Sequence, residues 1–356
     1  NIYNNKTVLQ NGGNIMRKNI TIKMETINEL VVGNFDQRKA LALLPMPAEI
    51  LNKLSLSPEW EIRCLVAKNP NTDSKTFERL SEDPDSRIKK EVCKNEKTPI
   101  KVLAKLAKEN SDDSTAMKEI IAGNKKTSAK ILSNLARDMS SGVRRYVASN
   151  PKTPEIILIG LALDKEYDVR EEVAKNPNTP LRIIKELSKD SDCLVRASVV
   201  DNPNTPIEIL EQLAHDCADC VKVALASSDR ISRELLSKLA KCSCGDEYDG
   251  YERIKVSAAG NPNLPVNLMY ELSECYCRAV RENVAKNVNV PVKILAKLAN
   301  DESFLVRENV AIHPKTPEKT LKKLMTDTSE SVRENVIQNP NVTREILAKL
   351  AEDESK

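Results

Sequence analysis

Six cysteines in the second half of the chain have the spacing of metal ligands. They form one C-x-x-C pair and two C-x-C pairs: Cys217, Cys220, Cys242, Cys244, Cys275 and Cys277. Thiolates in such pairs bind Zn²⁺ or an Fe–S cluster, and two neighbouring pairs supply four ligands, with His215 as a substitute. The alternative is that all six are small, half-buried loop residues that hold no metal.

Side chains for catalysis are scarce elsewhere in the sequence. The chain has only two histidines and nine glycines, and it contains no glycine-rich phosphate-binding loop. Carboxylates are numerous, but they recur with a regular period. Acid–base and nucleophilic catalysis need a few matched side chains gathered at one site. We therefore expect that the protein is not an enzyme.

The regular period comes from a five-residue phrase, Asn-Pro-Asn-Thr-Pro, whose first residue we call the anchor. Intact, variant and degenerate copies give these anchors: Leu43, Asn69, Asn95, Asn124, Asn150, Asn176, Asn202, Ser228, Asn261, Asn287, His313 and Asn339. Nine of the eleven intervals are 26 residues, one is 29 (from Asn95) and one is 33 (from Ser228). Such constant spacing indicates a repeat protein.

Apolar residues flank each anchor in two sets. One set stands seven and three residues before it, as in Val169 and Val173, and the other stands eight and eleven residues after it, as in Leu103 and Leu106. Spacings of three and four place side chains on one face of an α-helix. We therefore predict a first helix before each anchor and a second helix after it, which bury their apolar faces by stacking on neighbouring repeats.

The phrase also predicts the turn between the two helices. A residue before proline avoids helical dihedral angles, so Asn-Pro should end the first helix. In Thr179-Pro180 and Thr205-Pro206, the Thr should cap the second helix and the Pro should be its first residue. The recurring Asn should form a side-chain ladder that satisfies backbone groups of neighbouring turns.

The combined motif V-R-x-x-V-A-x-N-P-N-T-P-x-x-x-L-x-x-L-A-x-D resembles the leucine-rich repeat variant family over nearly the whole chain. Copies run from Val169 to Asp190 and from Val306 to Asp327. The resemblance implies alternating α and 3₁₀ helices in a right-handed superhelix, similar in shape to HEAT and armadillo arrays. One family member is associated with an Fe–S cluster held by N-terminal cysteines. No cysteine precedes Cys64 here, so that feature is not implied for this chain.

We therefore expect an all-α, right-handed solenoid of about twelve 26-residue repeats, without a sheet. Residues 1–15 should be a flexible leader, 16–60 an N-terminal cap with the first degenerate repeat, and 61–356 the repeat array, with an insertion at 245–251. Adjacent repeats in such an array lie about 10 Å apart. Thiolates on one metal lie closer than that, which favours the loop interpretation of the cysteines.

Two charged columns follow the same period. A basic residue stands six positions before eleven of the twelve anchors, and an acidic residue stands fourteen positions after nine of them. A basic stripe can bind nucleic-acid phosphates. The alternative, which we favour, is a structural ladder in which the acids neutralise the bases. Arg144, Arg170 and Arg196 of this column are candidate partner-binding residues.

The least regular part of the chain, roughly residues 215–280, contains the insertion, most of the cysteines and several tyrosines. Tyrosine suits interfaces because it offers apolar area together with a hydroxyl. Tyr248, Tyr251 and Tyr276 are therefore further candidate partner-binding residues. We expect a non-catalytic scaffold that binds another protein. The alternatives are nucleic-acid binding along the basic stripe and a regulatory role linked to Zn or an Fe–S cluster; no other cofactor is expected.

Composition constrains the partner and the location. Lys and Arg total 55 against 52 Asp and Glu, a net charge of +3 that is low for a general polyanion binder. One Trp and three Phe leave few platforms for stacked bases. No apolar run approaches the length of a membrane span. The absence of a recognisable secretory signal beside nine cysteines favours a reducing compartment, so we expect the cytoplasm.

Overall fold

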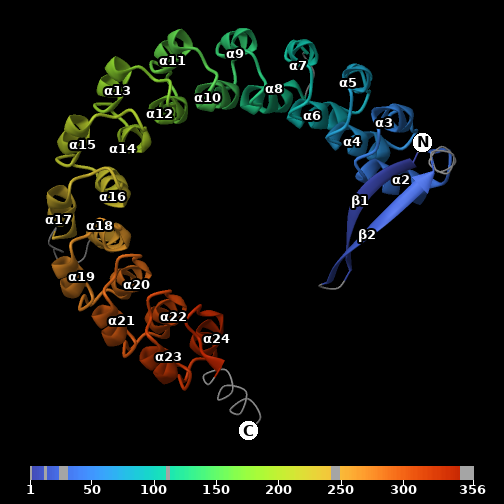
Figure 1. Ribbon diagram of the computed structural model, residues 1–356. Coiled ribbons are helices and arrows are strands. Elements are labelled where there is room, and N and C mark those ends of the chain that lie inside the picture. The colour runs from blue at the N-terminus through green and yellow to red at the C-terminus, as the bar shows by residue number, and fades with distance from the viewer. Residues whose placement is uncertain (1, 12–13, 24–30, 110–112, 242–248, 345–356) are drawn as a thin grey trace. The chain divides into compact units, whose positions relative to one another are not determined.

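Short α-helices follow one another in pairs along the computed structural model, which describes residues 2–11, 14–23, 31–109, 113–241 and 249–344. The chain divides into two units, Asn1–Asn178 and Thr179–Lys356 (Figure 1). Within each unit the first helices pack on the first helices of the neighbouring repeats, and the second helices contact the first helix of their own repeat, of the next repeat or of both. The expected helical solenoid is confirmed.

The first unit begins with a hairpin and continues with helix pairs. Its elements are β1 (Ile2–Asn11), β2 (Asn14–Lys23), α2 (Phe35–Leu43), α3 (Ala48–Leu54), α4 (Trp60–Lys68), α5 (Ser74–Leu80), α6 (Ser86–Lys94), α7 (Ile100–Leu106), α8 (Ser114–Gly123), α9 (Ala129–Leu135), α10 (Ser141–Ser149), α11 (Glu155–Leu161) and α12 (Tyr167–Lys175). First helices have even numbers and second helices have odd numbers.

The second unit contains helices only, within the residues described for it. They are α13 (Leu181–Leu187), α14 (Cys193–Asp201), α15 (Ile207–Leu213), α16 (Asp219–Ser227), α17 (Arg233–Ala240), α18 (Asp249–Gly260), α19 (Val266–Leu272), α20 (Arg278–Lys286), α21 (Val292–Leu298), α22 (Phe304–Ile312), α23 (Glu318–Leu324) and α24 (Glu330–Gln338). The alternation of first and second helices continues through this unit.

The predicted apolar columns form the core. In the repeat anchored at Asn150, Val143 and Val147 of the first helix and Leu158 of the second helix have no exposed surface, and Leu161 is 5 % exposed. A repeat of 26 residues cannot bury these side chains by itself, so stacking on its neighbours supplies the rest of the core.

The Asn ladder at the turns is confirmed. The Asn150 backbone is extended at the end of α10, and its side-chain amide donates to the carbonyl of Ala122 at 2.6 Å and to that of Asn124, the preceding anchor, at 3.2 Å. Its Oδ1 accepts the backbone N–H of Lys152 at 2.9 Å. Because buried backbone groups need partners, each anchor satisfies the turn of the repeat before it.

Two irregular anchors keep this ladder by other means. At His313 one ring nitrogen contacts the carbonyl of Asn287 at 3.2 Å and the other accepts the N–H of Lys315, which reproduces both functions of the Asn amide. Where Ser228 replaces Asn, the guanidinium of Arg230 donates to the Asn202 carbonyl at 2.6 Å. The ladder therefore depends on donor position more than on residue type.

The prediction that Thr caps the second helix was wrong. Pro154 precedes α11 as its N-cap and makes no side-chain capping bond, while the Thr153 hydroxyl donates at 2.5 Å to the carbonyl of Val147 in the first helix. The last carbonyls of a helix have no partner within that helix, and the Thr hydroxyl lies close enough to satisfy one of them. Thr thus closes the first helix instead of opening the second.

The second helices differ from the 3₁₀ conformation that the resemblance implied. Helix α7 is an α-helix of seven residues. Bonds of the 3₁₀ type occur at its two ends: the N–H of Val102 donates to the carbonyl of Pro99 at 2.9 Å, and those of Lys108 and Glu109 donate to Lys105 and Leu106, each at 3.1 Å. A short α-helix ending in a tighter turn is common at helix C-termini.

The N-terminal hairpin corrects two expectations, the flexible leader and the absence of a sheet. Strands β1 and β2 pair in antiparallel register from Ile2 with Lys23 to Asn11 with Asn14. The expected boundary at residue 16 therefore falls inside β2. The two residues between these strands in the sequence, Gly12-Gly13, are a common hairpin-turn dipeptide and are the signal that sequence reasoning overlooked.

Candidate functional site

The basic column forms ion pairs with the acidic column of the same repeat. Arg144 donates from Nε to Asp164 Oδ2 at 2.6 Å and from Nη2 to Asp164 Oδ1 at 2.9 Å. Its Nη1 donates to the carbonyls of Asp138 and Met139. Arg144 thereby joins the loop before α10 to the loop after α11.

This arrangement recurs in both units. The described pairs are Arg63–Asp83, Lys89–Glu109, Lys118–Asp138, Arg144–Asp164, Arg196–Asp216, Arg281–Asp301 and Arg307–Asp327. Hydrogen bonds from Arg196 lower the pKa of Asp216, and those from Arg307 lower the pKa of Asp327. The carboxylates therefore remain ionised, and the predicted structural ladder is confirmed for these pairs.

The ladder removes two of the proposed partner-binding arginines from consideration. The side chains of Arg144 and Arg196 are 10 % and 13 % exposed and are bound on both sides. Arg170 donates to the carbonyl of Asp164 at 2.8 Å. Such guanidinium groups are already bonded within the fold, so we do not assign Arg144 or Arg196 to a partner surface.

The cysteine site stays a prediction because Cys242 and Cys244 lie outside the described residues. Cys217 is exposed, and Cys220, Cys275 and Cys277 are half-buried. Within the described parts of the chain, no group of three or more His, Cys, Asp or Glu side chains is arranged to hold a metal ion.

Cys193, a further loop cysteine that we expected on the same edge but outside the set of metal ligands, is a neighbour of Cys220. It begins α14, and Cys220 lies in α16 one repeat later. Burial and then a hydrogen bond with Cys193 raise the pKa of Cys220 to about 11. A thiol with this pKa stays protonated near neutral pH, which makes it a poor nucleophile.

Tyr276 is the one predicted partner-binding tyrosine whose side chain the structure describes. It is 72 % exposed, beside Cys275 and Cys277 in the loop between α19 and α20. Tyr248 and the side chain of Tyr251 lie outside the described residues. The backbone of residues 249–251 belongs to α18, so part of the insertion lengthens a first helix to twelve residues.

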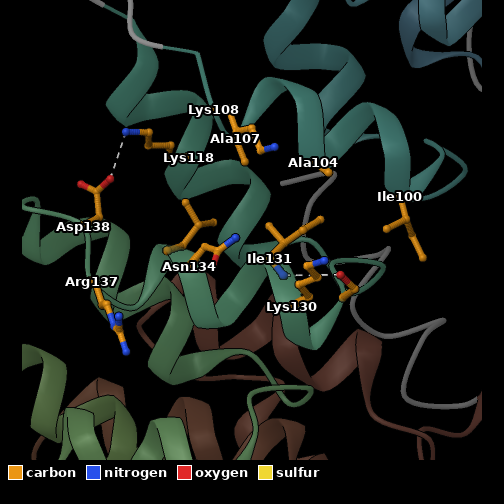
Figure 2. A pocket seen from close by; sticks show the side chains of 12 residues that line it. Ile100, Ala104, Ala107, Lys108, Lys118, Lys130, Ile131, Asn134, Arg137 and Asp138 are labelled. Atoms are coloured by element: carbon orange, nitrogen blue, oxygen red, sulfur yellow. Dashed lines mark hydrogen bonds and ion pairs between the residues drawn. The ribbon is translucent and has the colours of Figure 1, made fainter.

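Sequence reasoning missed the grooves between consecutive second helices. An open groove of the first unit has a volume of about 450 Å³ and lies between α7 and α9 (Figure 2). Its floor is apolar, formed by Ile100, Ala104, Ala107, Ile131 and Leu135. The interval of 29 residues falls between the repeats that form it, and this departure from the period was the signal that could have found it.

Cations surround the opening of this α7/α9 groove. Lys108, Lys130 and Arg137 are exposed and line it. Lys118, at one side in Figure 2, is paired with Asp138 at 3.0 Å. The groove thus combines an apolar floor with a positive rim, as small binding sites commonly do.

Two equivalent grooves occur in the second unit. The groove between α13 and α15 has a volume of about 530 Å³ and includes Lys185, Lys189 and Glu208. The groove between α17 and α19, of about 460 Å³, includes Lys255 and Glu271. Each of these contains both signs of charge. The α7/α9 groove differs because its one lining acid is already paired.

No described helix is both long and apolar enough to cross a membrane. No curated protein matches the chain. Among solved structures, a leucine-rich repeat variant with a novel repetitive structural motif is 22 % identical with a TM-score of 0.42, over 62 % of this chain and 84 % of that one.

A second similar structure comes from work on Kap95p binding to RanGDP in nuclear import complex assembly. It is 12 % identical with a TM-score of 0.37, and the match covers 88 % of this chain and 55 % of that one. Residues 194–216, which run from α14 to the end of α15, match the leucine-rich repeat variant family. The resemblance inferred from the repeated phrase is thereby confirmed, since residues 194–216 are similar to the leucine-rich repeat variant.

Proposed function

We propose that this solenoid is a non-catalytic scaffold that binds another protein through the exposed face of its second helices. One observation carries the proposal: the regular charges are consumed in ion pairs within the repeats, as in Arg144–Asp164 and Arg281–Asp301. The basic stripe is therefore a poor track for phosphates, which nucleic-acid binding would require. Cations without an ion pair in the described structure instead rim a groove with an apolar floor.

The exposed surface also suits a protein partner. Ile156, Leu163 and Met139 are 71 %, 82 % and 98 % exposed, and all three lie close in sequence to α9 and α11. Large apolar side chains gathered on a surface commonly mark protein interaction sites. Tyr276 supplies a separate exposed contact in the second unit.

Affinity capture from cells that naturally contain the protein tests this function, with retained proteins and nucleic acids both identified. We expect a defined protein that stays bound when the salt concentration is raised from 50 to 200 mM, a range over which phosphate-based binding falls by about 10³ or more. Recovery of nucleic acid alone, lost at the higher salt, would contradict the proposal.

A further inference from the structure

Ion pairs bridge the grooves between consecutive second helices at two places in the described structure. Between α5 and α7, Lys101 pairs with Glu78, and Lys105 Nζ lies 2.6 Å from Glu82 Oε1. The same pairing joins Lys297 to Glu274 between α19 and α21. Each pair links the second helix of one repeat to that of the next.

Both pairs are missing from the α7/α9 groove because three of the four positions have changed and only the first Lys is kept. Lys130 and Asn134 stand where Lys101 and Lys105 stand one repeat earlier. Ala104 and Lys108 stand where Glu78 and Glu82 stand. Lys130 therefore faces a methyl group, and Lys108 faces an amide. The space that the two ion pairs would fill is left as the cavity of about 450 Å³.

The acids that flank this groove in the described structure are already engaged. Glu109 pairs with Lys89 at 3.1 Å, Asp113 with Lys90 at 2.7 Å and Asp138 with Lys118 at 3.0 Å. Among the described residues, which exclude 110–112, no carboxylate forms an ion pair with Lys108, Lys130 or Arg137. The rim consequently carries positive charge that a ligand can complement.

The next second helix along the row offers an apolar surface. In α11, Ile156 occupies the position of Lys130 and Lys101, and it is the only apolar residue in that column of the repeat. Leu163 follows α11 at the position of Lys108 and Arg137. Helices α7, α9 and α11 follow one another along the array (Figure 1). The positive groove and the exposed apolar residues of α11 therefore belong to consecutive repeats.

We propose that the α7/α9 groove and the neighbouring face of α11 bind an acidic and apolar segment of a partner protein. Its carboxylates would lie among Lys108, Lys130 and Arg137, and a bulky apolar side chain would cover Ile156 and Leu163. The inference rests on the proposed protein-binding function and adds the site and the chemistry of the bound segment.

The spacing of the helices also fixes the spacing within the ligand. Neighbouring packed helices lie about 10 Å apart, and an extended chain advances about 3.4 Å per residue. An extended segment crossing from the groove to α11 therefore places its acidic and apolar side chains about three residues apart. A nucleic acid fits less well, because it would leave the apolar face uncovered and the groove lining offers no aromatic ring for stacking.

Selection from a random-peptide display library on the full chain tests the inference, with the wild-type protein as bait. The variant A104E/K108E/N134K serves for counter-selection, because it restores the two ion pairs of the preceding groove and so closes the cavity without removing core residues. The double variant K185E/K189E, in the equivalent α13/α15 groove, is the control for the double variant K108E/K130E, because both replace two Lys by two Glu.

We expect enriched peptides in which Asp or Glu stands about three residues from Leu, Ile or Phe. A fluorescein-labelled copy of one such peptide should bind A104E/K108E/N134K and K108E/K130E at least tenfold more weakly, and K185E/K189E within twofold of wild type. Replacing Ile156 by Ser should weaken binding at least fivefold.

Three outcomes would overturn the inference: no enriched peptide, enriched peptides without acids, or equal binding to the closed-groove variant. Binding of a 12-nucleotide RNA that depends on Lys108 and Lys130, without peptide binding, would also overturn it and would favour a nucleic-acid ligand. Capture of the same cellular protein by wild-type and closed-groove chains would refute this site while leaving the scaffold function intact.

Discussion

The turns that contain the anchors, which form the turn edge, keep the same contacts from repeat to repeat. The exposed side of the second helices, which we call the second-helix face, changes in sequence between the same repeats. At the turn edge, the hydrogen bonds of Asn150 recur at Asn95 and Asn287 with the same partners and similar lengths. On the second-helix face, the residue six positions after the anchor is Lys at Lys101 and Lys130 and becomes Ile at Ile156 in the next repeat. The contrast indicates that the edge holds the stack together, whereas the face is free to vary with the ligand.

The largest effect should come from the Asn ladder. Replacing Asn150 by Ala leaves the carbonyl of Ala122 and the N–H of Lys152 without their partners, while the carbonyl of Asn124 keeps its bond from the N–H of Thr127. At 1–3 kcal/mol for each unsatisfied buried group, we expect a loss of about 4 kcal/mol in the free energy of unfolding, measured by urea denaturation. The exposed Lys152→Ala variant keeps its backbone N–H and should change stability by less than about 0.5 kcal/mol. Equal effects would refute a structural ladder.

The Arg–Asp ladder should rank second. Arg144→Ala removes the partner of Asp164, whose side chain is 8 % exposed, and leaves a nearly buried carboxylate without its cation. Breaking such a pair costs about 3 kcal/mol. Arg145→Ala, one residue away on the same helix, should cost less than about 0.5 kcal/mol. If both variants unfold at the same urea concentration, the guanidinium of Arg144 does not hold the repeats together.

The substitute anchor at residue 228 offers a smaller test. Arg230 donates to the carbonyls of Asn202 and Thr205 in place of the missing Asn amide. Arg230→Ala should lower the free energy of unfolding by about 2 kcal/mol. The double variant S228N/R230A should recover at least half of that loss, because the restored amide reaches the same turn. Failure of this rescue would show that Arg230 does not replace the ladder.

The smallest effect should depend on pH. Burial lowers the pKa of His313, whose ring accepts the N–H of Lys315 in its neutral form. Since the unfolded chain binds the proton more readily, the contribution is complete above the ordinary histidine pKa of about 6.5 and declines as the pH falls below it. His313→Asn should abolish this decline between pH 7 and pH 5 in thermal melts. An unchanged pH profile would exclude His313 as its source.

Much of the fold could be predicted from the sequence because the same apolar columns and the same turn phrase occur in nearly every repeat. The apolar columns through Val143 and Leu158 predicted both helices, and the phrase around Asn150 predicted the ladder. The direction of the Thr153 hydroxyl could not be predicted, because its choice between two helix ends depends on the geometry of the turn.

The candidate site was harder to predict than the fold. In the sequence, the cysteines and tyrosines near the insertion were the residues that suggested a function, and of these Tyr276 is exposed. The α7/α9 groove is defined by what is missing, namely the acids at the positions of Ala104 and Lys108. Such a loss becomes informative only when the structure shows that Lys101 and Lys105 pair with those positions one repeat earlier.

A substitution scan of residues 60–178, read out both for folded abundance and for capture of the selected acidic peptide, tests the division between edge and face most directly. We predict that substitutions of Asn150 and Arg144 lower abundance, whereas those of Lys108, Lys130 and Ile156 leave abundance unchanged and lower capture. The opposite assignment, in which the groove residues are as necessary for folding as the ladder residues and capture follows abundance everywhere, would contradict the account.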